Sequence, residues 1–258
     1  MKSTELIEKT SDRLGIQVIS RAASLLRALQ NHPNGQSLGE LSKLIDLPRS
    51  TVQRIVDALH TEGFVIAASS SNGVRLGPAL LALASATRFR IGDVARPTLE
   101  ALAKECGETV DLSLADQGKA VFIDQISGTH RLTAVSAVGL YFPLHSSANG
   151  KAMLAAMLDA DIMKLKKKIQ LPPATPNSIT NWDVLDEEIM RVREHGVAYD
   201  NEENSLGISA VSMAISTPHG EIAAISIPVP TFRFTENKQK LEKCLRLHCS
   251  ELQRKLNG

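Results

Sequence analysis

Apolar residues recur at helical spacing in three short stretches near the start of the chain. "QVISRAASLLRAL" predicts a first helix, and residues 31–35, "NHPNG", end it with turn residues. Ser37 and Glu40 form the S-x-x-E pattern of a capping box, which predicts the start of a second helix. The apolar face of the first helix is expected to consist of Val18, Ile19, Ala22, Leu25, Leu26 and Leu29.

A third helix is predicted after a short turn, with Pro48 at its first position and Gly63 just beyond its end. Its buried stripe is expected to be Val52, Ile55, Val56 and Leu59. The following "FVIAASSSNGVRLG" places Ser-Ser-Ser-Asn-Gly between two short strand-like runs, which indicates a β-hairpin. Three helices and a hairpin predict a winged helix-turn-helix in residues 1–77, with residues 1–15 as a flexible arm.

Polar side chains crowd the first two turns of the third helix, which is the end that faces base edges in a helix-turn-helix. Arg49 and Arg54 suit phosphate or guanine, and Gln53 suits adenine. A solvated helix face is the alternative interpretation. We expect double-stranded DNA to be contacted by Ser37, Arg49, Ser50, Thr51, Gln53, Arg54 and Arg75.

Composition limits the classes of protein that fit. The net charge of +1 excludes a uniformly basic coat, and nine aromatic residues (six Phe, two Tyr, one Trp) argue against single-strand binding by base stacking. No apolar run reaches the ~18 residues of a membrane span. The start of the chain lacks the apolar core of a signal peptide, so we expect a cytoplasmic protein without membrane contact.

The second part of the chain alternates strand-like and helical runs. Residues 78–91 are expected to form a linker helix, and residues 92–258 an α+β domain on a mostly antiparallel sheet. Helices are predicted over residues 147–158, around "VLDEEIMRVREHG", and over residues 236–256. Strands are predicted at "ETVDLSLAD", "AVFIDQIS", "RLTAVSAVG", "ISAVSMAIST" and "EIAAISIPV".

Motifs of catalysis and metal binding fail or remain open. "SANGKAM" misses the phosphate-loop pattern twice, and the nucleophile-elbow pattern fails at Val211. His145 is interpreted as structural rather than as a general base. Cys244 and His248 lack further ligands at metal spacing, so no cofactor or metal is expected. The acidic run Asp200, Glu202 and Glu203 is either a carboxylate or metal site, or a capping loop.

The chain resembles the IclR family of bacterial transcriptional regulators in motifs that occur in order from residue 17 to the last helix. These are "SLGELSKLIDLPRSTVQRIVDALHTEGFV", "GETV", "PLHSSANGKAMLA", "REHGVAYDNEENSLGISAVSMAI" and "AAISIPVP". The resemblance implies a winged helix-turn-helix, a linker helix and a GAF-like effector-binding domain. It also implies homodimers or tetramers that bind operator DNA and respond to small organic acids.

The resemblance places an effector between the sheet and the helix after "PLH". It implies effector contacts at Leu132, Val135, Leu140, Ala148, Asn149, Asp200, Ala210 and Ser226. Asp200 would face the effector, and the neighbouring glutamates would stay solvated. The free N–H groups at the start of that helix independently suit a carboxylate. Ala210 and Pro228 replace polar residues of relatives that bind small keto acids, so a larger or aromatic acid is expected.

Two functions fit these observations. The favoured one is a ligand-responsive DNA-binding regulator, such as a repressor, without enzymatic activity. The alternative is a small-molecule-binding or catalytic domain whose helix-turn-helix mediates protein contacts. Steep weakening of binding with salt would distinguish the first from the second.

Overall fold

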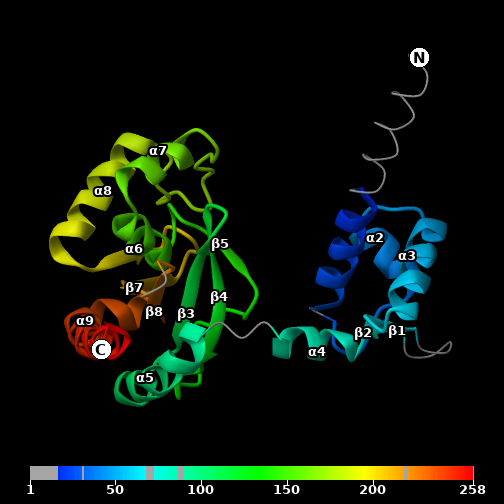
Figure 1. Ribbon diagram of the computed structural model, residues 1–258, viewed down its shortest axis with the longest axis horizontal. Coiled ribbons are helices and arrows are strands. Elements are labelled where there is room, and N and C mark those ends of the chain that lie inside the picture. Colours follow the sequence, from blue (N-terminus) through cyan, green and yellow to red (C-terminus); the bar gives the residue numbers. More distant parts are fainter. Residues whose placement is uncertain (1–16, 31, 68–72, 87–89, 218–219, 258) are drawn as a thin grey trace. The chain divides into compact units, whose positions relative to one another are not determined.

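The computed structural model describes residues 17–30, 32–67, 73–86, 90–217 and 220–257. The chain divides into two compact units, Met1–Arg88 and Phe89–Gly258, which are described separately (Figure 1). This division falls within the expected linker, residues 78–91. The arm expected at residues 1–15 lies outside the described residues.

The first unit contains a helix over residues 17–30, then α2 (Leu38–Leu44) and α3 (Arg49–Thr61). The antiparallel strands β1 (Val65–Ala67) and β2 (Val74–Leu76) follow. The predicted helix-turn-helix and hairpin are confirmed, although residues 68–72 of the expected turn lie outside the described residues. Their shared core consists of Leu25, Leu29, Leu41, Val52, Ile55, Val56, Leu59, Val65 and Val74.

Two details of the first unit differ from the sequence-based expectation. Pro48 is the cap residue of α3, with extended backbone at ψ 139°, rather than its first helical residue. Val18 and Ile19 are 53% and 72% exposed, because the core contacts of their helix begin further along it, at Ala22. The amphipathic period therefore predicted the helix correctly and overstated the length of its buried face.

The second unit begins with α5 (Arg90–Cys106), after α4 (Ala79–Ala86) at the end of the first; residues 87–89 between them are not described. Its sheet has six strands in the order β5-β4-β3-β8-β7-β6, and every pairing is antiparallel. The strands are β3 (Val110–Asp116), β4 (Lys119–Ile126), β5 (Tyr141–Pro143), β6 (Ala198–Asn201), β7 (Ile208–Ser216) and β8 (Ile222–Pro230).

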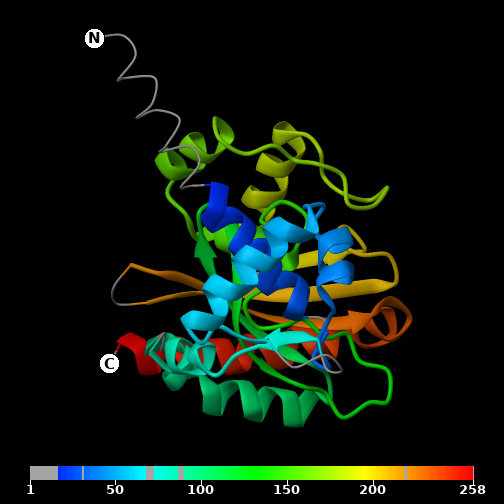
Figure 2. The same cartoon turned by 90° about the vertical axis from the view of Figure 1, so that its right-hand side faces the viewer.

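Helices cover both faces of this sheet. One face packs against α5 and α9 (Thr231–Asn257), and the other against α6 (Ala148–Ala156) and α8 (Trp182–His195). Figure 2 shows α5 and α9 below the sheet and α8 above it. Strand alternation explains the two cores, because Val110, Leu112 and Leu114 face α5 and α9 while Asp111 and Ser113 face the opposite side.

Two predictions for the second unit were wrong, and three of its elements were not predicted. Residues 131–139 form a loop rather than a strand, and α9 begins at Thr231, before the predicted residue 236. The short strands β5 and β6 and the helix α7 (Asp159–Lys166) were not predicted. No helix in the described ranges is long and apolar enough to cross a membrane.

Candidate functional site

The polar residues of α3 lie on its exposed side. Arg49, Ser50 and Arg54 are exposed, whereas Thr51 and Gln53 are half-buried beside the apolar stripe. The Gln53 side-chain amide donates to Asp57 Oδ1 at 2.7 Å, so Gln53 would have to leave this partner to read a base. Arg75 is exposed on β2. The cationic groups expected to meet DNA are therefore accessible in the first unit.

Ser37 has a structural task at the start of α2. Its Oγ accepts the backbone N–H of Glu40 at 3.2 Å, and Glu40 Oε2 accepts the N–H of Ser37 at 2.8 Å. This reciprocal pair is a complete capping box. A DNA contact by Ser37 would use the same hydroxyl, so its cap role is the one that the geometry supports directly.

The second unit contains a cavity of about 280 Å³ between the sheet and the start of α6. Six residues expected at an effector site line it: Val135, Ala148, Asn149, Asp200, Ala210 and Ser226. Two others, Leu132 and Leu140, are not among its lining residues and are 60% and 41% exposed. These six residues come from a loop, a helix and three strands.

Leu132 and Leu140 lie outside because residues 131–139 form a loop. This loop is held at its ends by hydrogen bonds of its backbone: the Arg233 guanidinium donates to Leu132 O at 2.8 Å, and Gly139 N–H donates to Phe122 O at 2.7 Å. In its middle, the Ser136 hydroxyl donates to Asp111 Oδ2 at 2.8 Å. These anchors bring residues 133–136, rather than the flanking leucines, against the cavity.

The start of α6 forms one wall of the cavity. Ser147 caps this helix: its Oγ accepts the N–H of Gly150 at 3.3 Å and donates to Pro143 O at 2.7 Å. A Cβ added at Gly150 would lie 2.4 Å from Leu144 Cα, so only glycine allows the helix to approach this backbone. The Asn149 side chain donates to Ser113 Oγ at 2.9 Å, which ties the helix to β3.

Two buried carboxyl groups line the cavity. Burial raises the pKa of Asp200 to about 7 and that of Asp111 to about 6. Asp111 had not been expected there, and neither had Phe122 and Phe142, whose rings meet edge to face with centroids 4.8 Å apart. The signal for Asp111 was its position on the polar face of a strand, but whether that face was covered could not be read from the sequence.

A buried ion cluster lies next to the cavity. Lys151, one turn into α6, is 1% exposed at its side chain and donates to both carboxylate oxygens of Glu203, at 2.6 and 2.8 Å. Its Nζ is also 3.3 Å from Glu188 Oε1. The expectation that the glutamates stay solvated is therefore wrong for Glu203, because the buried ammonium of Lys151 requires a counter-ion.

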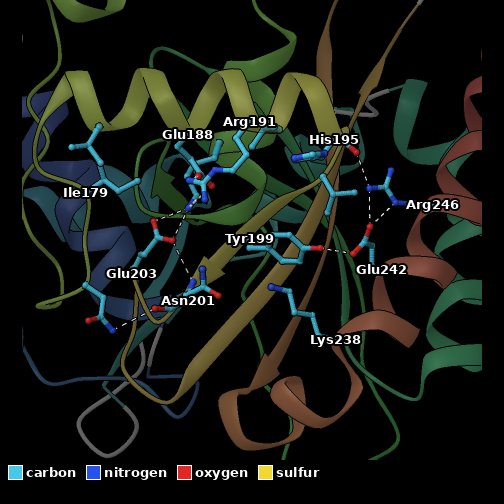
Figure 3. A pocket seen from close by; sticks show the side chains of 15 residues that line it. Ile179, Glu188, Arg191, His195, Tyr199, Asn201, Glu203, Lys238, Glu242 and Arg246 are labelled. Atoms are coloured by element: carbon cyan, nitrogen blue, oxygen red, sulfur yellow. Dashed lines mark hydrogen bonds and ion pairs between the residues drawn. The ribbon is translucent and has the colours of Figure 1, made fainter.

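A larger hollow, about 860 Å³, follows the open edge of the sheet between α8 and α9. Figure 3 shows Tyr199 and Asn201 of β6 along it, with Arg191 and His195 on one side and Lys238 and Arg246 on the other. Most of its charges are already paired, since Arg191 contacts Glu188 and Arg246 contacts Glu242. We name this hollow the edge groove.

His145 has the environment of a structural histidine. It is 2% exposed, and its Nε2 donates to Pro172 O at 3.1 Å. Burial lowers its pKa, which disfavours the charged form. His145 does not line the cavity beside α6, which offers hydrogen-bond donors and acceptors to a small molecule.

Comparisons with known proteins agree with this architecture. Residues 18–66 match the model of the IclR helix-turn-helix domain, and residues 83–254 match that of the bacterial transcriptional regulator IclR C-terminal domain. The chain is 42% identical to the HTH-type transcriptional regulator Rv1719 of Mycobacterium tuberculosis, over 95% of this chain and 94% of that protein. It is 30% identical to the transcriptional repressor IclR of Escherichia coli, over 86% and 83% of the two chains.

Solved structures show the same fold. The Thermotoga maritima IclR structure has a TM-score of 0.76 and 32% identity, and the match covers 94% of this chain and all (100%) of that one. An IclR homologue from Microbacterium hydrocarbonoxydans, complexed with 4-hydroxybenzoate, has a TM-score of 0.76 at 21% identity, over 93% and 99% of the two chains. Sequence motifs, fold and relatives thus lead to one conclusion: the chain belongs to the IclR family of bacterial transcriptional regulators.

Proposed function

We propose that the protein binds operator DNA through α3 and changes this binding when a small molecule occupies the cavity beside α6. The observation that carries the proposal is that the start of α3 is exposed and basic, while the apolar stripe of the same helix is buried. In a helix-turn-helix, the start of this helix enters the major groove. Two arginines near that end suit a DNA contact, whereas a merely solvated helix face does not require them there. The hydrogen-bonding cavity in the other unit supports a ligand response.

The DNA contacts divide by chemistry. Arg49 and Arg54 carry the positive charge, and Ser50 and Thr51 add hydroxyl donors for phosphate. Arg75 extends the contact from the hairpin. Gln53 reads a base only after it releases Asp57. This division predicts that most of the affinity, and most of its salt dependence, comes from the arginines.

We further propose a homodimer, or a tetramer of two dimers, that places two α3 helices in successive major grooves, about 34 Å apart. The protein would act in the cytoplasm, as a repressor without catalytic activity. The support for repression is the name of the 30% identical Escherichia coli relative. The support for ligand control is the liganded Microbacterium homologue, whose fold this chain shares.

The test measures fluorescence anisotropy of a labelled duplex from upstream of the protein's own gene, at several salt concentrations. Arg49→Ala combined with Arg54→Ala should weaken binding and reduce the slope of log affinity against log salt by about 2, because each lost phosphate contact contributes about 0.9. Arg254→Ala, an exposed arginine near the end of α9, is the matched control and should change neither quantity.

Three outcomes are informative. If the DNA affinity and its salt slope fall only in the α3 variant, the result supports α3 as the helix that contacts the DNA. Wild-type affinity in that variant would rule α3 out as the DNA contact. Binding that hardly responds to salt would favour the alternative, in which the helix-turn-helix contacts another protein.

A further inference from the structure

The cavity beside α6 has a one-sided charge. Its described lining residues include two carboxylates, Asp111 and Asp200, and no lysine, arginine or histidine. An organic acid bound there would bring a further negative charge without a cationic side chain to receive it. The nearest buried ammonium, that of Lys151, already has Glu203 and Glu188 as partners.

The two carboxylates act separately. Asp111 lies on β3 and Asp200 on β6, with β8 and β7 between them, so their backbones are three strand spacings, or roughly 14 Å, apart. At this distance they cannot share a proton as a dyad does. Each must meet hydrogen-bond donors of its own.

Asp200 has one oxygen in use and one available. Its Oδ1 accepts the backbone N–H of Glu203 at 2.7 Å and, at 3.4 Å, that of Asn204. Its Oδ2 has no hydrogen-bond partner among the described residues. A ligand that donates a hydrogen bond would satisfy this oxygen.

Asp111 is already held by neutral donors, Gln125 Nε2 at 2.7 Å and the Ser136 hydroxyl at 2.8 Å. Each carboxylate oxygen has a further lone pair that accepts from a ligand. Ser136 belongs to the loop over the cavity, so Asp111 also fixes the position of that loop. No charged group neutralises it within hydrogen-bond distance in the described structure.

The start of α6 offers the opposite kind of partner. Ser147 satisfies the N–H of Gly150, while the N–H groups of Ala148 and Asn149 have no acceptor among the described residues. These groups carry the positive end of the helix dipole, equivalent to about half a charge, which favours an oxygen that accepts. An ammonium cannot accept a hydrogen bond, and a carboxylate cannot donate one. A hydroxyl does both.

We propose that Asp111 and Asp200 select an uncharged, hydroxylated ring compound as the effector, in place of the organic acid that the family resemblance implies. The hydroxyl donates to a carboxylate and accepts from the first turn of α6, and the ring lies against Phe122 and Phe142. When both carboxyl groups are ionised, their charge outweighs the half charge of the helix end, so an anionic ligand is repelled. This inference rests on the proposed function, because it names the ligand class of the same cavity.

The test uses three probes that differ in one group: benzyl alcohol, benzylamine and benzoate, with the corresponding naphthyl compounds as larger versions. Calorimetric titration of the full chain at pH 8, where both carboxylates are mostly ionised, should show an alcohol binding at least about tenfold more tightly than its acid. At pH 6 this ratio should narrow, because Asp200 is then protonated. Tightest binding by the amine, equal binding by the acid, or no binding by either alcohol would overturn the inference.

Variants locate the effect in the two carboxyl groups. Asp200→Asn keeps an oxygen for the two backbone N–H groups and replaces only the free oxygen with a donor, so the ratio at pH 8 should fall to near one. Asp111→Asn should act in the same direction, since Gln125 and Ser136 can reorient around an amide. Asp116→Asn, on the same strand but outside the cavity, is the control and should keep the wild-type ratio.

The two proposals fail in different ways. Operator binding is measured without any probe compound. A wild-type protein that does not bind the operator would contradict the DNA-binding proposal and would not bear on the ligand class. An intact operator complex combined with an acid-selective cavity would overturn only the ligand class. A wild-type ratio in both cavity variants would show that the carboxylates do not set the selectivity.

Discussion

Gly150 sets how closely α6 approaches the segment before it. The position of its missing side chain is occupied by the backbone of Leu144, with a Cα at 2.4 Å and an oxygen at 2.5 Å. Backbone atoms cannot adopt another rotamer to make room, as a flexible side chain can. The first turn of α6, which lines the cavity, is therefore positioned by contact as well as by its cap.

Replacing Gly150 with alanine should lower the free energy of unfolding by about 1–3 kcal/mol, the usual cost of overfilling a packed site. It should also weaken ligand binding, because the helix end must move. Gly92→Ala is the control: that glycine is helical too, and nothing lies within 4 Å of its added Cβ, so stability should stay the same or rise by up to about 1 kcal/mol. Urea unfolding of both variants measures this, and equal stabilities would contradict the packing argument.

At this scale the sequence revealed residues whose chemistry depends on local pattern. The alternation around Asp111 indicated a strand with one polar face, and the resemblance placed Asp200 near an effector. The sequence could not show that α6 covers the polar face of β3. Burial of Asp111 is a consequence of this tertiary contact, and so is the raised pKa of its carboxyl group.

Among the elements, α2 depends on its cap more than on its core. It has seven residues and one buried side chain, Leu41, so the capping box contributes a large share of its stability. Isolated helices of this length are unstable in water. The cap and a possible DNA contact use the same hydroxyl of Ser37, and a mutation can separate the two roles.

Ser37→Ala should destabilise α2 by about 1 kcal/mol, through loss of one side-chain acceptor. Amide hydrogen exchange of residues 38–44 should then become about fivefold faster if the helix opens locally, since about 1 kcal/mol corresponds to that factor. Ser50→Ala, an exposed serine of α3 without a cap role, should leave this exchange unchanged. Unchanged exchange in Ser37→Ala would mean that the cap is dispensable and that a direct DNA contact is the better explanation.

Elements with a strong buried stripe could be predicted, and those held by long-range contacts could not. The stripe of α3 was complete in the sequence and is buried as expected. Residues 131–139 alternate like a strand, yet side chains and Gly139 anchor them as a loop. The start of α9, "TFRFT", has strand-like residues, but Phe234 and Leu241 reach the same core seven residues apart, and that packing overrides local preference.

The proposal of a ligand-controlled DNA switch has a thermodynamic requirement for the whole molecule. If a ligand changes operator affinity by some factor, the operator must change ligand affinity by the same factor. The alcohol that binds best is titrated into the free protein and into the protein–duplex complex. The ratio of these two ligand affinities should equal the ratio of the operator affinities measured with and without the ligand. The Arg49→Ala, Arg54→Ala double variant should bind the ligand with the affinity of the free protein, with or without duplex.

A ratio of one from both sides would mean that ligand and DNA bind independently, without a shared conformational equilibrium, and would contradict the proposed ligand control. A random duplex of the same length is the control, since non-specific contacts should couple only weakly to the ligand.

The edge groove also affects how readily the sheet can pair with the sheet of another molecule. β6 is the last strand of the sheet, and such an edge is open to pairing with another chain. At Asn201 this route is obstructed, because its backbone N–H donates to Glu203 Oε1 at 3.3 Å and its carbonyl accepts from Asn177 Nδ2 at 3.4 Å. An incoming strand would have to displace the carboxylate that neutralises Lys151. We infer that the buried ion pair hinders edge-to-edge pairing at this end of β6, and that this obstruction would be lost together with Glu203 even in a variant that still folds.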